Sequence, residues 1–314
     1  MIIKKIRKRH VDWRDFLCST PAMDYVFQKD AYEDQIDRAA ENIRNADCVI
    51  IGAGAGASTA SGIQYGGKRF TDNFAEFIKK YGGHYMTDMY AAGFYPYPSE
   101  EAKWGYWSKH ALMNRFDPPA LPLYNELYDI VKNKKYFVLT TNVDHQFYKA
   151  GFDGKRIFTT QGDYGKIQCQ KACHPKTYDA EALFRKMDKA RRDCLIPSEL
   201  VPKCPVCGGN MAMNLRCDNY FVEDEAWHEA ADRYADFLKQ NRDKKVVLLE
   251  LGVGFNTPII IRFPFEKMVR ENSLYSLIRL NMDEAVVPEN FGKRAIGIGG
   301  DMARAITDIR ESVL

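Results

Sequence analysis

The chain has 314 residues, of which 46% are hydrophobic and 28% charged, and its net charge is +3. These are ordinary values for a folded globular protein, and they exclude a disordered or collagen-like chain. The length exceeds that of a typical single domain, so we expect one large α/β domain with a smaller inserted module. Because Lys and Arg are mixed with Asp and Glu, nothing predicts a nucleic-acid partner.

The terminal segments carry little apolar character. The basic run at residues 4–10 (KKIRKRH) could form a surface for an acidic partner, but such runs are more often solvated. No segment reaches the roughly 18 to 20 consecutive apolar residues of a membrane span, and no signal-peptide core follows the first charges. We therefore expect a cytoplasmic protein without a membrane partner, whose eight cysteines are reduced thiols or metal ligands.

The predicted elements begin with an N-terminal helical extension over residues 1–45, whose helix covers Tyr32–Asn45. A buried strand at 46–51 follows and leads into glycines, as in the opening of a nucleotide-binding unit. Later apolar runs predict four more buried strands, of which the last is the weakest: 136–140, 246–251, 275–280 and 295–298. Together they predict a Rossmann-like parallel sheet with helices on both faces, whose active site collects at the carboxyl ends of the strands.

Two segments interrupt this pattern. Residues 79–123 are rich in Tyr, Trp and Pro, and we expect a helical insertion that forms a packed aromatic cap. Residues 169–217 carry clustered cysteines, a charged helical stretch and Pro-rich turns, which predict a small inserted zinc-binding module. The Rossmann-like domain then comprises residues 46–168 and 218–314.

The cysteines of the module have the spacing of metal ligands. Cys169 and Cys173 form a C-x3-C pair, and Cys204 and Cys207 form a C-x2-C pair followed by two glycines. Four thiolates in this pattern favour a closed, tetrahedral, structural zinc site, although His174 or Cys194 could replace one ligand. The other cysteines are predicted to be packing residues: Cys18, Cys48 and Cys217.

The turn from Gly52 to Gly62 contains only small side chains and follows the first predicted strand. Such a turn lets backbone N–H groups approach a pyrophosphate, but it is equally typical of a strand-to-helix connection without a ligand. The spacing lacks the G-x-G-x-x-G pattern and the acidic residue of hydride-transferring enzymes. A dehydrogenase is therefore not favoured.

Further motifs narrow the interpretation. The run from Gly54 to Ile63 (GAGASTASGI) resembles the signature loop of the sirtuin family, which consists of NAD-consuming enzymes with a Rossmann-like sheet and a zinc module. Thr141 to Asp144 (TNVD) resembles the family's Gln-Asn-Ile-Asp motif, and Gly252 to Gly254 stands where the family has Gly-Thr-Ser. Asn281 and Gly300-Asp301 match the adenosine-side loops, so the resemblance covers roughly residues 46 to 310.

The resemblance implies NAD as co-substrate and gives roles to single residues. Asn142 would orient the nicotinamide ribose, Asp144 would hold the carboxamide, and Asn281 would meet the adenosine ribose. The full set of NAD-binding residues that it implies is Gly54, Ala55, Gly56, Ser58, Ile63, Tyr65, Phe70, Asn142, Asp144, Gly252, Gly254, Phe255, Asn281 and Asp301.

Gln161 is the main departure, because deacylating sirtuins carry a His base at this position. A glutamine amide has no titratable proton near neutral pH and cannot act as that base. Efficient lysine deacylation is therefore not expected here. Transfer to an acceptor that arrives as a carboxylate needs no base and would still be possible. The loop from Tyr65 to Phe70 and the run from Gly252 to Pro258 (GVGFNTP) also depart from the deacylases.

Gln161 together with these two altered segments is similar to the pattern of the macrodomain-associated sirtuins of bacteria and fungi. That class implies an NAD-dependent protein ADP-ribosyltransferase with Asn142 and Gln161 as catalytic residues. It also implies a lipoylated carrier protein, related to the glycine-cleavage H protein, as acceptor and a macrodomain hydrolase as functional partner. Two alternatives stay open: a lysine deacylase that uses another base, and a non-catalytic NAD sensor.

Overall fold

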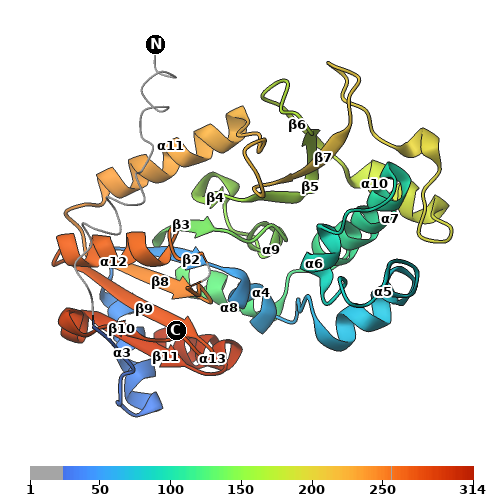
Figure 1. The fold of residues 1–314 in the computed structure, drawn as a ribbon. Helices are drawn as coiled ribbons and strands as arrows, with labels where there is room; N and C mark the ends of the chain where they lie inside the picture. Colours follow the sequence, from blue (N-terminus) through green and yellow to red (C-terminus); the bar gives the residue numbers. More distant parts are fainter. Residues whose placement is uncertain (1–23, 256) are drawn as a thin grey trace.

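The structure is a computed structural model that describes residues 24–255 and 257–314 (Figure 1). The basic run 4–10, Cys18 and most of the predicted N-terminal extension lie outside the described residues. The predicted helix of that extension is confirmed as α3 (Tyr32–Asn45), which buries Ile36, Ala39, Ala40 and Ile43.

Six parallel strands form the central sheet, in the order β11-β9-β8-β2-β3-β4. Their bounds are β2 (Cys48–Ala53), β3 (Lys135–Thr140), β4 (Ile157–Thr159), β8 (Val246–Leu251), β9 (Tyr275–Asn281) and β11 (Ala295–Gly299). The predicted parallel sheet and its five predicted strands are confirmed. The edge strand β4 was not predicted, because three residues are too few to give a recognisable pattern.

Strand β2, the first strand predicted from the sequence, continues beyond its apolar run through Gly52 and Ala53. A side chain at Gly52 could not be accommodated, since a Cβ there would lie 2.5 Å from Ile261 and 2.6 Å from Phe265. This glycine therefore serves packing between the sheet and a helix. The candidate phosphate-binding turn begins only at Gly54.

Helices cover both faces of the sheet (Figure 1). One face packs against α3, α8 (Pro122–Val131) and α13 (Met302–Val313), and the other packs against α11 (Glu225–Gln240) and α12 (Arg262–Glu271). Because both faces are covered, β2 and β8 are buried along their whole length. The doubly wound arrangement agrees with the predicted fold class.

The strand order reverses between β2 and β8. From β2 the chain proceeds to β3 and β4 on one side, and it returns to place β8, β9 and β11 on the other. Connections diverge at such a point, which leaves a crevice at the carboxyl ends of the two strands. There the Gly54 N–H donates to the Leu251 carbonyl at 2.9 Å, and the Gly56 N–H donates to the Gly252 carbonyl at 3.0 Å.

A second lobe lies beside the carboxyl ends of the strands (Figure 1). It contains α5 (Gly67–Tyr81), α6 (Met89–Gly93), α7 (Glu100–Ala111), a π-helical turn (Leu112–Phe116) and α10 (Glu181–Ala190). These helices pack with an antiparallel sheet in the order β6-β5-β7. The three strands are β5 (Gly162–Cys169), β6 (Thr177–Asp179) and β7 (Met211–Leu215).

The aromatic insertion and the cysteine-rich segment share one hydrophobic core in this lobe. Trp104, Tyr106 and Trp107 are buried, as predicted for a packed cap, whereas Tyr85, Tyr90 and Phe94 are exposed, against that prediction. The division of the chain into residue ranges stays a prediction, and β5 begins at Gly162, ahead of the range proposed for the module.

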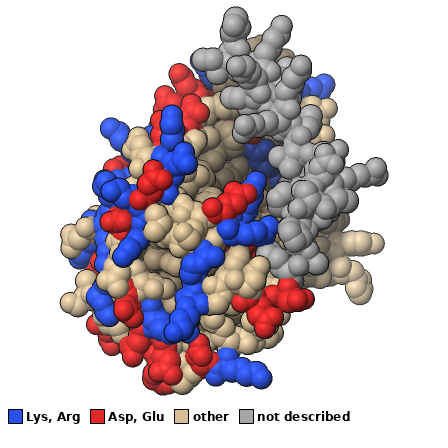
Figure 2. All heavy atoms as spheres, turned by 90° about the vertical axis from the view of Figure 1, so that its left-hand side faces the viewer, with Lys and Arg blue, Asp and Glu red and all other residues tan. Residues whose placement is uncertain are grey.

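The remaining elements are short. They are β1 (Tyr25–Val26) and β10 (Val287–Pro288), which pair antiparallel, the helices α4 (Ala55–Ala60) and α9 (Gln146–Lys149), and 3-10 turns at Gly154–Arg156, Ser198–Leu200 and Glu289–Arg294. Over residues 24–255 and 257–314, none of the helices has the length and apolarity needed to span a bilayer. On the face drawn in Figure 2, basic and acidic side chains are interspersed.

The contact between the β2 and β8 loops can be tested with one substitution. At Gly252, φ is +59°, and a Cβ would lie 2.4 Å from the Gly56 Cα. We expect Gly252→Ala to lower the free energy of unfolding by about 3 kcal/mol, since both the left-handed backbone and the overlap oppose a side chain. Urea unfolding measures this loss.

Gly292 provides the matched control. Its φ is +54°, but nothing lies within 4 Å of a Cβ built there. Its ψ of −128° places it in a backbone region that is essentially restricted to glycine. Gly292→Ala should therefore cost about 2 kcal/mol, from the backbone conformation alone and without any overlap. Equal losses in the two variants would mean that the close approach of the loops contributes nothing.

Candidate active site

The predicted site residues follow the carboxyl edge of the sheet in spatial order. Strands far apart in sequence end side by side there, because all six run in the same direction. Across the sheet from β11 to β4, the residues at or just after the strand ends are Asp301, Asn281, Gly252, Gly54, Asn142 and Gln161. The residues predicted to bind adenosine (the adenosine side) and those predicted to bind nicotinamide (the nicotinamide side) thus lie at opposite ends of one edge.

At the centre of this edge, glycines are required for contact between loops. A Cβ at Gly54 would lie 2.7 Å from the Gly252 carbonyl oxygen, and one at Gly56 would lie 2.6 Å from the Gly252 Cα. Gly54 precedes α4, and Ala55 and Gly56 form its first turn. The glycine-rich turn therefore has a packing role in addition to any contact with phosphate.

Four polar side chains meet beneath that turn. The Asn142 Nδ2 donates to the Gly54 carbonyl at 2.9 Å, and the Ser58 hydroxyl donates to the Asp144 carboxylate. The Tyr124 hydroxyl lies 3.3 Å from the Ser58 Oγ. All four residues are buried, so the cluster is fixed before any ligand binds.

Asp144 is the carboxylate of this buried cluster. Burial raises the pKa of its carboxyl above the ordinary value, against hydrogen bonds from Ser58 and from the Gln146 N–H. The carboxylate is thus held in a place where water solvates it poorly, and a ligand N–H would be a favourable additional donor.

Gln161 lies at the other side of the Asn142 loop, between β4 and β5. Its backbone carbonyl accepts the Arg216 N–H at 3.0 Å. The side chain is partly exposed and makes no hydrogen bond to the residues that the structure describes. It is therefore available to a ligand.

An ion-paired carboxylate, Asp163, lies two residues after Gln161 in the sequence. Asp163 accepts from the Arg115 Nε at 2.9 Å, and its other oxygen lies 2.9 Å from the His145 Nδ1. Burial alone would raise the pKa of Asp163, but the hydrogen bonds and charges of His145 and Arg115 hold it below its ordinary value. His145 is thus a hydrogen-bonded loop residue.

An aromatic cluster surrounds Tyr65, one of the residues predicted to bind NAD. Tyr65 is half-buried, and its ring centroid lies 6.4 Å from that of Tyr164 and 5.8 Å from that of His110. Burial lowers the pKa of His110 to about 3, so its ring is neutral at physiological pH. Two other predicted NAD-binding residues, Ile63 and Phe70, are buried, and Phe70 stacks on Phe74 in the core of the second lobe.

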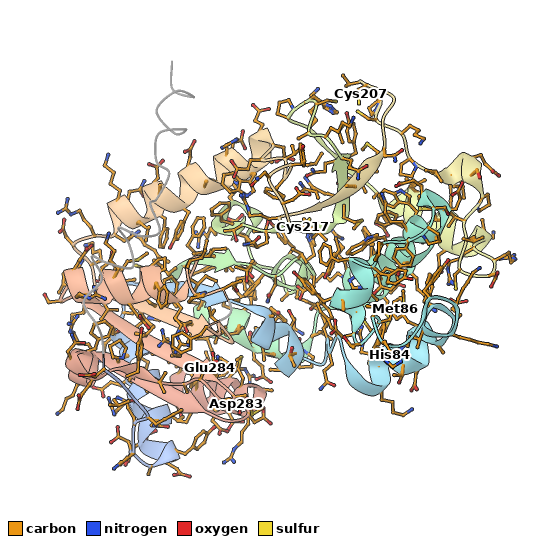
Figure 3. The ribbon with its side chains drawn as sticks, viewed as in Figure 1. His84, Met86, Cys207, Cys217, Asp283 and Glu284 are labelled. Atoms are coloured by element: carbon orange, nitrogen blue, oxygen red, sulfur yellow. The ribbon has the colours of Figure 1, made fainter. Side chains whose placement is uncertain are left out.

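The adenosine-side residues come from the loops after β8, β9 and β11. The Asn281 Nδ2 donates to the Val253 carbonyl at 3.2 Å, and the Phe255 N–H donates to the Glu284 carboxylate at 2.9 Å. Glu284 and Asp283 lie together at the carboxyl end of β9 (Figure 3). Gly254 lies in the same β8 loop, and Asp301 caps α13 by accepting from two of its N–H groups.

Three residues of the site had no role in the sequence-based prediction. Tyr124 comes from a segment without a motif, and only the fold brings it to Ser58. Asp163 follows Gln161 by two residues, and only the fold pairs it with Arg115. Arg262 had a usable signal, because a charged residue directly after Ile259-Ile260-Ile261 is expected to be buried and paired. It is fully buried below the Val253 loop.

The four predicted metal ligands form one cluster in the second lobe. The sulfur atoms of Cys169, Cys173, Cys204 and Cys207 all lie within 4.8 Å of one another. Two of the sulfur–sulfur distances are 3.8 and 3.6 Å. A tetrahedral zinc ion with bonds of ~2.3 Å requires edges of about 3.8 Å, so the thiols fit this ion.

The neighbours of the cluster agree with a closed, structural site. The His174 Nδ1 lies 3.0 Å from the Cys173 sulfur, while its Nε2 lies 2.8 Å from the Tyr178 hydroxyl. Cys194 is buried outside the cluster. Cys48 is buried as predicted, but Cys217 is exposed, so its prediction as a packing residue is wrong.

Solved structures of Sir2 enzymes share the fold of this chain. No known family model matches the sequence. Among solved structures, a Sir2 homologue in complex with NAD superposes with a TM-score of 0.57 at 16% identity, covering 94% of this chain and 100% of that one. A second structure, described as a basis for the mechanism and regulation of Sir2 enzymes, gives a TM-score of 0.54 at 19% identity, covering 90% and 98%.

A protein ADP-ribosyltransferase of Staphylococcus aureus is 37% identical over 287 residues, which are 91% of this chain and 90% of that protein. The chain belongs to the sirtuin family, on its protein ADP-ribosyltransferase branch. A probable bifunctional ADP-ribose hydrolase/ADP-ribosyltransferase of Fusarium oxysporum is 34% identical over 285 residues. Those residues are 85% of this sirtuin and 46% of the fungal protein.

The cysteine cluster of this sirtuin can be tested by comparing two exposed thiols. Cys207 lies at the outer end of the second lobe, whereas Cys217 lies between that lobe and the sheet (Figure 3). Cys207→Ala should lose bound zinc and lower stability by several kcal/mol, because ligation of the ion contributes directly to folding. Metal analysis and thermal unfolding measure both effects. Cys217→Ala should keep the zinc and the unfolding temperature of the wild type.

The pKa shifts of two aspartates predict opposite effects of pH. Because the pKa of Asp144 is raised in the folded state, wild-type stability falls as pH rises from about 4 through that folded pKa, and Asp144→Asn removes this loss. Asp163 has a lowered pKa, so its contribution is present above pH ~4 and is lost as pH falls through the folded value.

Urea unfolding between pH 3 and 7 measures both variants. Relative to wild type, Asp144→Asn should gain stability with rising pH, while Asp163→Asn should lose it. Parallel pH profiles for the two variants would contradict the assignment of Asp163 as an ion-paired carboxylate and of Asp144 as one whose burial dominates.

Proposed function

We propose that this sirtuin binds NAD along the carboxyl edge of its sheet, breaks the bond between nicotinamide and ribose, and transfers ADP-ribose to a protein. The main support for this proposal is Gln161, which stands at the position where a deacylase needs a base. The loop that precedes it in the sequence holds the preformed Asn142–Asp144 cluster. The names of the bacterial and fungal relatives support the same activity.

The proposed roles follow from the hydrogen bonds that are already made. Asn142 has its amide nitrogen engaged by the Gly54 carbonyl, which leaves its oxygen to accept from a ribose hydroxyl. Asp144 would accept from the carboxamide N–H, and its negative charge would stabilise the positive charge that develops on the ribose. Gln161 would orient a ribose hydroxyl without removing its proton.

The transfer step balances without a base. The glycosidic C–N bond breaks, and its electron pair leaves with nicotinamide, which loses its positive charge. A carboxylate oxygen of the acceptor then forms a new C–O bond to the same ribose carbon. No proton has to move, so an Asp or Glu acceptor suits a site with glutamine in this position.

The half-buried Tyr65 and the buried Tyr164 would keep water away from the reacting carbon. Exclusion of water matters here, because hydrolysis of NAD would compete with transfer to a protein. The zinc ion, if held by Cys169, Cys173, Cys204 and Cys207, would act only on structure, since four thiolates leave no open position.

For the acceptor we propose a lipoylated carrier protein related to the glycine-cleavage H protein, modified on a carboxylate. A macrodomain-type hydrolase would remove the modification. The fungal relative is named for both ADP-ribose hydrolase and ADP-ribosyltransferase activities, which supports a link between them. Clustered thiols suit a reducing compartment, and we propose the cytoplasm.

Transfer can be measured with labelled NAD and a lipoylated carrier, followed by mass spectrometry of the carrier. Asn142→Ala should lower the rate about 100-fold or more, as expected for a group that contacts the reacting centre. Gln161→Ala should lower it by about tenfold, because only orientation is lost. Asn133→Ala and Gln240→Ala, at exposed positions, serve as matched controls.

The two other interpretations predict different results from the same preparation. Robust deacetylation of acyl-lysine peptides, with a group titrating near neutral pH and no label on the carrier, would replace the transferase by a deacylase. Stoichiometric NAD binding without nicotinamide release over hours would instead indicate a sensor.

A further inference from the structure

A buried arginine lies beneath the loops at the adenosine end of the site. Arg262 is the first residue of α12 and is 0% exposed. Its Nη1 donates to the Val253 carbonyl at 3.0 Å, in the loop after β8. Its Nη2 donates to the Glu284 and Val286 carbonyls at 3.1 and 3.4 Å, in the segment after β9. One guanidinium therefore joins two loops that are separate in sequence.

The same side chain also contacts the exposed part of the site. Its guanidinium carbon lies 3.8 Å from the centroid of the Phe255 ring, which is 41% exposed. Its Nη1 lies 3.9 Å from the Glu284 carboxylate, and that carboxylate accepts the Phe255 N–H. Arg262 thereby influences the position of both the backbone and the ring of Phe255.

Asn281 depends on the same carbonyl group. The Val253 oxygen accepts from both the Arg262 Nη1 and the Asn281 Nδ2. The Asn281 oxygen, in turn, accepts the N–H groups of Asp283 and Glu284. A shift of the Val253 carbonyl would therefore rotate or release the side chain that we expect to meet the adenosine ribose.

Arg262 belongs to a buried cluster in which positive and negative side chains balance. Its Nε lies 3.9 Å from the Glu266 carboxylate, which also accepts from Arg279 at 2.8 Å and from the Tyr25 hydroxyl at 2.8 Å. Arg279 in turn forms a two-point ion pair with Glu250. Two arginines and two glutamates are thus fully buried together, and their positions are coupled because an unpaired charge there is costly.

We propose that Arg262 is a positioning residue for NAD, which holds the loops 252–255 and 281–286 in the binding arrangement before the dinucleotide arrives. This inference rests on the proposed function. Loops that are already ordered bind more tightly, since no further ordering is needed on binding. The planar guanidinium reaches the two loops from two separate nitrogens, Nη1 and Nη2, a spread that the single ammonium nitrogen of lysine cannot reproduce.

Arg294 offers a matched control, because it makes a similar clamp elsewhere. Its Nη1 donates to the carbonyls of Val269, Asn272 and Tyr275, and its guanidinium lies 5.9 Å from the Phe291 ring. These carbonyls belong to the last turn of α12, the residue after it and the amino end of β9, away from the carboxyl edge of the sheet. A purely structural role for arginine clamps predicts the same behaviour from both residues.

The experiment compares Arg262→Lys, Arg262→Met and Arg294→Met in the full chain. Calorimetry gives the Kd for NAD, steady-state transfer gives KM and kcat, and thermal unfolding gives stability. Arg262→Lys keeps the charge opposite Glu266 and should fold. We expect its Kd and KM for NAD to rise about tenfold, the loss expected for hydrogen bonds to a charged group, with kcat close to that of wild type.

Arg294→Met should lower the unfolding temperature and leave Kd unchanged. A folded Arg262→Lys with wild-type Kd and KM, or an Arg294→Met with an equal rise in Kd, would overturn the inference. If Arg262→Met does not fold, Phe255→Leu removes the stacked ring alone and should raise Kd several-fold. A wild-type protein that binds NAD but transfers nothing would refute the proposed function and leave the Kd comparison to decide this inference.

Discussion

The contact between Gly252 and the turn after β2 is the constraint on which the site depends. Two loops meet there backbone to backbone, and a single Cβ on Gly54, Gly56 or Gly252 would separate them. The hydrogen bonds from Gly54 and Gly56 fix the ends of β2 and β8 relative to each other. Asn142 is then positioned by the Gly54 carbonyl, and Arg262 and Asn281 by the loop that follows Gly252.

The second lobe is attached to this centre through shared packing. Tyr65 and Val143, which flank the proposed nicotinamide site, pack against the same core as the buried Cys169 and Cys204. The Tyr164 N–H donates to the Val143 carbonyl at 3.1 Å. Because protein cores are close-packed, a change at the thiol cluster would be felt at the Tyr65 and Val143 loops. Zinc would therefore influence the site without taking part in the chemistry.

Several buried charges in the protein are better explained by function than by stability. Asp144 is placed where its ionised form is poorly solvated, and Arg262 has a guanidinium nitrogen without a hydrogen-bond partner among the described residues. Hydrophobic residues of similar size could stabilise such places at least as well. A carboxylate ready for a carboxamide and an arginine beneath two ligand loops are both consistent with a site organised before NAD binds.

The sequence by itself determined the elements and the chemistry that local patterns carry. Continuous apolar runs marked five of the six strands, C-x3-C and C-x2-C spacing marked the thiol cluster, and the absence of a titratable group at Gln161 could be read directly. These features are local, because burial on both faces, ligand spacing and side-chain acidity depend on a few adjacent residues.

Only the tertiary structure decided which distant residues meet. The reversal of strand order between β2 and β8 brings Gly252 to Gly56. The packing of helices on the sheet brings Tyr124 to Ser58 and Arg262 to Glu284, although no local pattern links these pairs. Packing likewise joined the aromatic insertion to the cysteine lobe and left Tyr85, Tyr90 and Phe94 exposed. Contacts of this kind depend on topology and on the shape of neighbouring elements, which short stretches of sequence do not specify.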